Sequence, residues 1–390
     1  MYSAQQLGFT TPGTPAPGAM RGTVPGCDLS VLQENGRIPD LYRGRDLEVC
    51  RWVERFSWGF RKSFSLAPEW KACRQLRLTL KGIDYAAEIF LNGVSIGHHT
   101  GMFLPFEYDV TQLIDRDGEN LLAVIFDIAP QACPNHQEQK PAEFAYFHRH
   151  QMGFGWDWAR AAITTGIWDH VELAGYGAAR MKDVFFRYLG EGHCRVAFDF
   201  EALEDGTFPL AIRLVPDGFS GKSAELRTSV ALRAGSNHAE FDFDIAEPHL
   251  WYPNGYGEQP LYDLTVDLGD GMDRCCRKAG LRTISMARNP NSPEGAYDQT
   301  FVINGVKIFA RGLNWVPEDL LFYRTEKKDY ERLVKCAVLS GFNLFRSWGG
   351  GLIEKTEFFE CCDKYGIMVW QEFPHGCSNS PKDPDYLAYS

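Results

Sequence analysis

The stretch Leu344–Phe373, LFRSWGGGLIEKTEFFECCDKYGIMVWQEF, decides the fold of its part of the chain. A short apolar run ends at Arg346 and Trp348, a helix-like segment follows, and a second apolar run ends at Trp370 and Glu372. Short apolar strands separated by amphipathic helices are typical of a parallel sheet built from βα units. The pattern therefore places polar and aromatic side chains at the end of each strand.

The same pattern begins upstream. The run VKIFARGLNW at 306–315 is strand-like, and GFNLFRSW at 341–348 and GIMVWQEF at 366–373 follow it. Apolar residues at helical spacing lie between these strands: Tyr330, Leu333, Val334, Ala337 and Val338, then Phe358, Phe359, Cys362 and Tyr365. In a (β/α)₈ barrel the C-terminal strand ends form the active face, so we expect Asn314 to converge there with the residues after the other two strands.

The tryptophans at these strand ends have an alternative interpretation. Trp348 and Trp370 are packing residues if the sheet belongs to an ordinary α/β domain. Against this, Arg346, Gln371 and Glu372 also lie at strand ends, and burying polar groups without partners costs free energy. We therefore favour a functional cluster.

The first part of the chain has a different pattern. From about Asp46 to Leu173, short aromatic and β-branched runs alternate with turn signals, and Asn92-Gly93 is a strong hairpin signal. This predicts an antiparallel β-sandwich. The segment AYFHRHQMGFGWDWARAAITTGIWDHVEL at 145–173 is too rich in aromatic residues and glycine to be a plain strand or helix.

A second sandwich is predicted from about Arg180 to Ile284, where short runs resemble the strands of an immunoglobulin-like domain. The segment HLWYPNGYGEQPLYDL at 249–264 is a loop leading into a strand, and a buried aromatic corner and a functional role both remain open for it. ARNPNSPEGAYD at 287–298 is predicted to be a linker. The expected domains are residues 1–178, 179–285 and 286–390.

Composition limits the possible functions. The 390 residues carry a formal charge of −11 without a block of basic residues, which argues against nucleic acid and anionic membranes as partners. The eleven cysteines show no paired CxxC spacing, which argues against zinc and a disulfide framework. The N-terminus does not resemble a secretory signal, and no apolar run approaches the roughly 20 residues that cross a bilayer. We therefore expect a cytoplasmic protein without a membrane segment.

Several motifs occur in a characteristic order. They are GTVPGCDLSVLQENGRIPDLYRG, FGWDW with TTGIW, LWYPNGYGEQPLY, INGVKIFARGLNWVPED, FRSWGGG with FFECCDKYGI, and VWQEF. In this order the chain resembles glycoside hydrolase family 2 and, within it, the β-mannosidases. The resemblance implies a multidomain protein with a jelly-roll-like sugar-binding β-sandwich, an immunoglobulin-like β-sandwich and then a (β/α)₈ barrel, of which this chain holds the first three βα units.

The resemblance also implies a retaining exo-glycosidase that removes a β-linked sugar from a non-reducing end. That reaction uses two carboxyl groups about 5–5.5 Å apart. The family carries its acid/base after the fourth barrel strand and its nucleophile on a later one, so both are expected beyond Ser390 and no catalytic residue is expected in this chain. The chain is thus expected to be an N-terminal part that is inactive by itself. No metal or cofactor is expected.

Asp157 of the GWDW motif matches a residue that accepts hydrogen bonds from sugar hydroxyls in the β-mannosidases. Its flanking tryptophans offer apolar faces to a sugar ring. Alternatively, this is a structural loop whose carboxylate is satisfied by backbone N–H groups. Glu372 is expected to orient substrate or to hold a neighbouring catalytic group. The expected substrate-binding residues are Asp157, Trp156, Asn314, Arg346, Trp348, Trp370 and Glu372.

The chain departs from the family pattern beside the expected pocket. Ala159-Arg160-Ala161 replaces the usual Gly-Pro-Arg, and Pro374-His375-Gly376-Cys377 replaces a Phe-rich segment. β-Galactoside, β-glucuronide and β-glucosaminide therefore remain alternatives to β-mannoside as the glycoside or oligosaccharide substrate. A non-catalytic carbohydrate-binding or structural protein is a second class of function, and the oligomeric state is left open. Removing everything after about Ile284 is expected to improve solubility and to leave two folded sandwiches, because three barrel strands expose an open edge.

Overall fold

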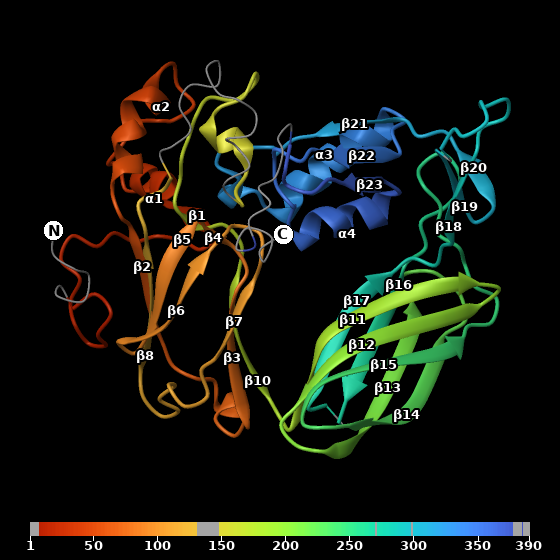
Figure 1. The fold of residues 1–390 in the computed structure, drawn as a ribbon, viewed down its shortest axis with the longest axis horizontal. Helices are drawn as coiled ribbons and strands as arrows, with labels where there is room; N and C mark the ends of the chain where they lie inside the picture. Colours follow the sequence, from red (N-terminus) through yellow and green to blue (C-terminus); the bar gives the residue numbers. More distant parts are fainter. Residues whose placement is uncertain (1–7, 131–147, 270, 298, 377–383, 385–390) are drawn as a thin grey trace.

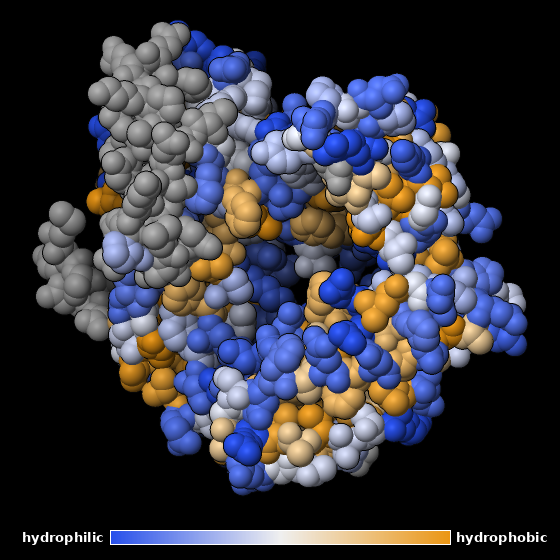
Figure 2. Space-filling view, turned by 45° about the vertical axis from the view of Figure 1, so that its right-hand side comes forward, coloured by the Kyte–Doolittle hydropathy of each residue, from blue (hydrophilic) through white to orange (hydrophobic). Residues whose placement is uncertain are grey.

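The computed structural model describes residues 8–130, 148–269, 271–297, 299–376 and 384. Figure 1 shows two β-rich bodies side by side and a smaller α/β body above and between them. The space-filling view shows a hollow near the centre of one face of the molecule (Figure 2). Within the described residues, no helix has the length and apolar character that a membrane crossing requires.

The first body is an antiparallel β-sandwich, as predicted. One sheet has the order β2-β8-β5-β6 and the other β10-β3-β7, and side chains from both sheets share one core. Asn92 and Gly93 connect β5 to β6 with φ of 51° and 85°, which confirms the predicted hairpin turn. The strands are β2 (Gly59–Phe64), β3 (Gln75–Leu80), β5 (Ala86–Leu91), β6 (Val94–Thr100), β7 (Phe106–Asp109), β8 (Asn120–Phe126) and β10 (Val171–Tyr176).

Shorter elements lie beside this sandwich. A small sheet has the order β1-β9-β4, with β1 (Gly26–Cys27), β4 (Ile83–Asp84) and β9 (Gly166–Ile167). The helices are α1 (Asp28–Glu34), α2 (Asp46–Val49), η1 (Cys50–Arg55), η2 (Pro68–Trp70) and η4 (Gln151–Phe154). The small sheet brings the GCDLS and TTGIW motifs together, because β1 pairs with β9.

The second body is a sandwich of seven antiparallel strands. Its sheets have the orders β11-β12-β15 and β14-β13-β16-β17, and alternate residues such as Phe198 and Ile212 fill the core between them. The arrangement agrees with the predicted immunoglobulin-like sandwich. The strands are β11 (Ala179–Gly190), β12 (His193–Ala202), β13 (Gly206–Pro216), β14 (Ala224–Leu232), β15 (Gly235–Asp244), β16 (Tyr262–Leu268) and β17 (Asp273–Ala279).

A three-stranded antiparallel sheet follows, formed by β18 (Ile284–Ala287), β19 (Thr300–Ile303) and β20 (Val306–Ile308). The segment 287–298 was predicted to be a linker, but its residue 287 ends β18 and residues 288–297 lie between the paired strands β18 and β19. β18 also spans the predicted domain boundary between residues 285 and 286.

The predicted strand at 306–315 is in fact two strands. β20 ends at Ile308, and β21 (Gly312–Trp315) begins a separate parallel sheet. The Asn343 side chain accepts from Arg311 N (2.9 Å) and donates to Phe309 O (3.1 Å). The Asn343 side chain thus binds the backbone between β20 and β21. The pattern of apolar residues at 306–315 gives no sign of this contact, because Asn343 lies outside that segment.

The third body contains the predicted alternation of strand and helix. The parallel sheet has the order β21-β22-β23, with β22 (Leu344–Ser347) and β23 (Met368–Gln371). The helices α3 (Lys327–Leu339) and α4 (Thr356–Tyr365) pack with Trp315 and Phe345 in one core, and η5 (Phe322–Arg324) precedes α3. Both helices therefore cover the same face of the sheet.

The first and third bodies share a hydrophobic core. Leu321, Phe322 and Tyr323 of the third body are each at most 2% exposed. They pack in one cluster with residues of the first body that include Leu29 and Trp168. The expectation that the two sandwiches fold without the segment after Ile284 is therefore not supported.

The loop at 249–264 joins the second body to the third. Trp251 Nε1 donates to Asp363 O (2.7 Å), and Asn254 N donates to Gly366 O (2.7 Å). Asn254 Nδ2 also donates to Phe342 O (2.8 Å) just after α3. The sequence left open whether this loop is a buried aromatic corner or has a functional role. In the structure it connects the second body to the third through these hydrogen bonds.

Candidate functional site

Three predicted residues lie in one row on the sheet face that the helices leave open. Asn314 of β21 is in register with Arg346 of β22, and Arg346 is in register with Trp370 of β23. Residues in register on parallel strands point to the same side of a sheet. Arg346 Nη1 donates to Asn314 Oδ1 (2.9 Å), whereas Trp370 is 56% exposed.

Glu372 binds Arg346 at the end of β23. Arg346 Nε and Nη2 donate to Glu372 Oε1 at 2.8 and 2.6 Å, and Gly349 N donates to Glu372 Oε2 (2.9 Å). Both oxygens of this carboxylate thus have donors within the protein. Glu372 therefore fixes the Arg346 guanidinium and the turn after β22.

The turn after β22 contacts the first body through its glycines. Gly350 O accepts hydrogen bonds from Gln151 N (2.9 Å) and Met152 N (3.1 Å). A Cβ at Gly350 would overlap the indole ring of Trp348, so this position requires glycine. The FRSWGGG motif therefore provides close backbone contact between two bodies.

The GWDW motif lies against the same turn. Trp156 and Trp158 have ring centroids 4.9 and 5.9 Å from that of Trp348. The motif forms a tight turn in which Trp156 N donates to Ala159 O (2.9 Å), and Ala159 N donates to Trp156 O (3.2 Å). Asp157 is exposed within this turn. The structure thus brings the predicted residues of the first body to the strand ends of the third.

A buried polar network near these contacts was missed by the sequence analysis. Arg149 Nε lies 2.8 Å from Asp84 Oδ1, and Tyr323 OH donates to Asp84 Oδ2 (2.5 Å). Burial acts to raise the pKa of Asp84, but Arg149 and His150 lower it to about 2. The sequence feature that could have indicated this network is the run of polar residues HRHQ at 148–151, before the GWDW motif.

Asp28, in the first turn of α1, is a second buried carboxyl. Its oxygens accept from Leu29 N (2.7 Å) and Thr165 Oγ1 (3.0 Å). Burial raises the pKa of Asp28 to about 7, although both hydrogen bonds act in the opposite direction. At a pH between these two pKa values, Asp84 is ionised whereas Asp28 is protonated.

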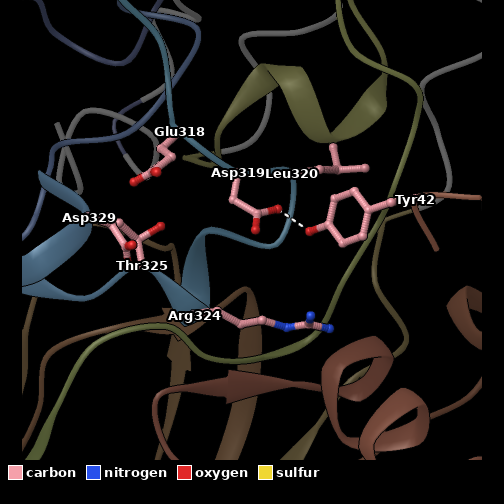
Figure 3. Close-up of a pocket in the computed structure, with 7 residues that line it drawn as sticks. All are labelled: Tyr42, Glu318, Asp319, Leu320, Arg324, Thr325 and Asp329. Atoms are coloured by element: carbon pink, nitrogen blue, oxygen red, sulfur yellow. Dashed lines mark hydrogen bonds between the residues drawn. The ribbon is translucent and has the colours of Figure 1, made fainter. Parts of the chain in front are cut away.

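A polar cavity of about 330 Å³ lies beside the segment after β21. Figure 3 shows the Tyr42 hydroxyl pointing to the Asp319 carboxylate, to which it donates a hydrogen bond. Asp319 also accepts from Leu321 N (2.8 Å), as expected for a residue that caps the following segment, whereas Glu318 pairs with Arg332. The lining residues are Tyr42, Glu318, Asp319, Leu320, Arg324, Thr325 and Asp329.

No group of three or more His, Cys, Asp or Glu side chains in the described part of the chain is arranged to hold a metal ion. The chemistry of the strand ends is instead that of hydrogen-bonding and aromatic side chains. Such a combination suits a polyhydroxylated ring, whose hydroxyls need polar partners and whose C–H face packs on an indole.

Comparison with known proteins gives two family matches. Residues 6–169 match the glycosyl hydrolase 2 galactose-binding domain-like model, and residues 179–282 match the glycosyl hydrolases family 2 model. The chain is 32% identical over 388 residues to β-mannosidase B of Emericella nidulans, covering 94% of this chain and 44% of that protein. It is 29% identical to β-mannosidase of Capra hircus, covering 93% of this chain and 44% of that protein.

A solved structure shows the same arrangement. The β-D-mannosidase from Dictyoglomus thermophilum superposes with a TM-score of 0.84 and 33% identity, covering 96% of this chain and 47% of that one. The chain thus spans less than half the length of each of these relatives. On these matches, the chain belongs to glycoside hydrolase family 2 and is similar to the N-terminal part of its β-mannosidases.

Proposed function

We propose that this chain is the N-terminal part of a retaining, β-mannosidase-like exo-glycosidase that removes a β-linked sugar from a non-reducing end. The observation that carries the proposal is the contact of Trp156 and Trp158 with Trp348 at the strand ends. This contact supports a position for Asp157 near the face that holds Arg346. The similarity to β-mannosidases supports the choice of β-mannoside over other sugars.

The parallel sheet is proposed to be the first three βα units of a (β/α)₈ barrel. Its helices α3 and α4 cover one face, and Asn314 and Arg346 lie on the other, as the walls of such a barrel require. The expected domains of 1–178, 179–285 and 286–390 are proposed with one change: the second boundary is placed before Ile284, so that β18 stays with its partner β19. The acid/base and nucleophile are proposed to lie outside this chain, on later strands.

Within this chain, each residue has a proposed task in binding the sugar. Asp157 accepts hydrogen bonds from sugar hydroxyls, and the neighbouring indoles exclude water from the ring. Arg346 donates hydrogen bonds toward the reacting sugar, and Glu372 holds its guanidinium in place. In a retaining mechanism, one carboxyl group then attacks the anomeric carbon while the other protonates the leaving oxygen.

The test compares the 390-residue chain with a complete protein that contains it. Purified 390-residue chain is expected to show no turnover of aryl β-mannoside above a mock preparation, because both catalytic carboxyl groups are needed. The complete protein is expected to hydrolyse the same substrate. Turnover by the 390-residue chain would contradict the proposed location of the catalytic groups.

A complete protein without activity on any β-glycoside would instead favour the second class, a carbohydrate-binding or structural protein. Parallel assays with β-galactoside, β-glucuronide and β-glucosaminide distinguish the sugar specificities. A preference for one of these over β-mannoside would overturn the proposed substrate and retain the proposed reaction.

A further inference from the structure

The buried network around Asp84 is built from distant parts of the chain. Asp84 ends β4, Arg149 precedes η4, Thr164 precedes β9, and Tyr323 lies in η5 of the third body. Each of these residues is at most 2% exposed. A charged pair buried this deeply is costly unless further hydrogen bonds satisfy its remaining polar groups.

Three side chains approach the Asp84 carboxylate, and its Oδ1 has only the ion pair with Arg149 rather than a hydrogen bond. Arg149 approaches both oxygens, with Nε 2.8 Å from Oδ1 and Nη2 3.0 Å from Oδ2. Oδ2 also accepts from Tyr323 OH (2.5 Å) and Thr164 Oγ1 (3.1 Å). Removing any one partner leaves a buried charge with fewer hydrogen bonds.

Arg149 and Thr164 are the two ends of the segment that carries the GWDW turn. Arg149 Nη2 donates to Thr164 O (2.6 Å), so the ends are also joined directly. Between them, Gln151 N and Met152 N donate to Gly350 O. The segment 149–164 is therefore closed at its base by Asp84 and held against the third body near its start.

Tyr323 supplies the link at the base of this loop. Its hydroxyl donates to Asp84 Oδ2 and lies 2.6 Å from the Thr164 Oγ1 atom of the first body. Its ring stacks on Phe322, with centroids 4.4 Å apart, in the core that the two bodies share. The base of the loop thus cannot shift relative to η5 without breaking these contacts.

We propose that Asp84 and Tyr323 are positioning residues that fix the 149–164 loop on the third body, so that Asp157 and its two flanking tryptophans stay over the strand ends. The inference rests on the proposed function, because it explains how a sugar-binding carboxylate on a long loop keeps its place. Neither residue is proposed to touch the sugar. Their effect on binding is through the position of the loop.

Tyr323→Phe tests this proposal, and Tyr330→Phe is its matched control. Tyr330 is equally buried, and its hydroxyl also donates to a buried carboxylate, Glu354 Oε2 (2.7 Å), within the third body. Hydrogen–deuterium exchange of the 390-residue chain is the measurement. Tyr323→Phe is expected to speed exchange within 149–164 by about ten-fold, the change produced by losing one buried hydrogen bond to a charged group. The control variant, Tyr330→Phe, is expected to leave the exchange rates within 149–164 unchanged.

A spectroscopic signature separates positioning from general loss of stability. The indoles of Trp156 and Trp158 both lie close to that of Trp348 and should give an exciton couplet in circular dichroism, identified by its loss in Trp348→Phe. Tyr323→Phe is expected to weaken the couplet, and Tyr330→Phe is expected to retain it. Equal effects of both variants on the couplet and on exchange of 149–164 would overturn the proposal, as would no effect of either.

Thr164→Val serves as a second variant if Tyr323→Phe does not fold. It removes the other hydroxyl that donates to Asp84 while keeping the side-chain volume, and it is expected to speed exchange in the same segment. Unchanged exchange would overturn the proposal. These measurements require no catalysis, so their failure is distinct from failure of the proposed function, which depends on turnover by the complete protein.

Discussion

Glu372 and Asp157 are the two carboxylates at the candidate site, and they have different surroundings. Glu372 accepts hydrogen bonds from Arg346 and Gly349 on both of its oxygens. Asp157 is exposed within a tight turn flanked by tryptophans. A sugar hydroxyl needs an accessible acceptor, so Asp157 is the better residue with which to test sugar binding.

Asp157→Ala in the complete protein is expected to lower kcat/KM for aryl β-mannoside by about 10- to 150-fold. This range follows from losing one charge-assisted hydrogen bond of roughly 1.5–3 kcal/mol. Thermal stability is expected to stay the same, because the side chain is exposed. Wild-type kinetics with an unchanged melting temperature would leave the GWDW motif as a packing turn only.

Asp28→Asn is expected to change the pH dependence of stability. The folded pKa of Asp28, about 7, is above the ordinary aspartate value of 3.8. Between these values the folded state holds a proton that the unfolded state has lost, so the stabilising contribution is complete below about pH 4 and is lost as the pH rises to 7. Asparagine does not titrate, so the variant should gain stability relative to wild type by about 1.4 kcal/mol per pH unit in this window.

Denaturant unfolding of both proteins at pH 5, 6, 7 and 8 measures the effect. The prediction concerns the difference in unfolding free energy between the variant and the wild type. His99 and Glu354 also have shifted pKa values, and their contributions cancel in this difference. The difference should level off above pH 7. A difference that stays constant from pH 5 to pH 8 would contradict the assignment.

At the scale of elements, a loop of the second body caps α3. Asn254 Nδ2 donates to Val338 O (3.1 Å) and Phe342 O (2.8 Å) at the C-terminal end of this helix. The last carbonyls of a helix have no partner within the helix, so they need donors from outside. The motif LWYPNGYGEQPLY therefore stabilises an element of another body.

Asn254→Ala is expected to destabilise the C-terminal end of α3 by about 0.5–1.5 kcal/mol, because Phe342 O loses this donor and Val338 O keeps only Gly341 N (2.9 Å). Amide exchange in the last turn of α3 should become faster, whereas exchange in β11 to β17 should not. Asn237→Ala is a control, since Asn237 Nδ2 donates to Arg233 O and Gly235 O within the second body alone. If Asn237→Ala sped exchange in α3 as much as Asn254→Ala did, the capping role would be wrong.

At the scale of the whole molecule, the first body has a core of its own between its two sheets and shares a second buried cluster with the third body. A variant that ends at Ile284 loses Leu321, Phe322, Tyr323 and Leu352 from the shared cluster. Each fully buried apolar side chain contributes about 1.5–3 kcal/mol, and a typical domain is stable by only 5–15 kcal/mol. We therefore expect the first sandwich of this variant to lose most of its stability.

Calorimetry and binding of a hydrophobic dye measure this outcome. The shortened variant is expected to bind the dye and to lose the transition of the first sandwich. The seven-stranded sandwich has its own core and should keep a separate transition, which makes it an internal control. Two intact transitions without dye binding would mean that the shared core contributes little.

Local patterns in the sequence determined much of this molecule. The spacing of apolar residues predicted α3 and α4, the Asn92-Gly93 pair predicted the hairpin, and the ends of the short apolar runs predicted which side chains lie at the strand ends. These features depend on neighbours within a few residues, because a helix or strand repeats over that distance. The alignment of Asn314, Arg346 and Trp370 in one row also requires the register of three separate strands, which the local pattern does not specify.

Only the tertiary structure decided which distant segments meet. The pairing of β18 with β19, the break before β21 and the buried partners of Asp84 all join residues far apart in the sequence. Likewise, the contact of Trp156 with Trp348 exists because two bodies share a core. Such contacts depend on how helices, strands and loops pack against one another, and the local spacing of apolar residues does not specify that packing.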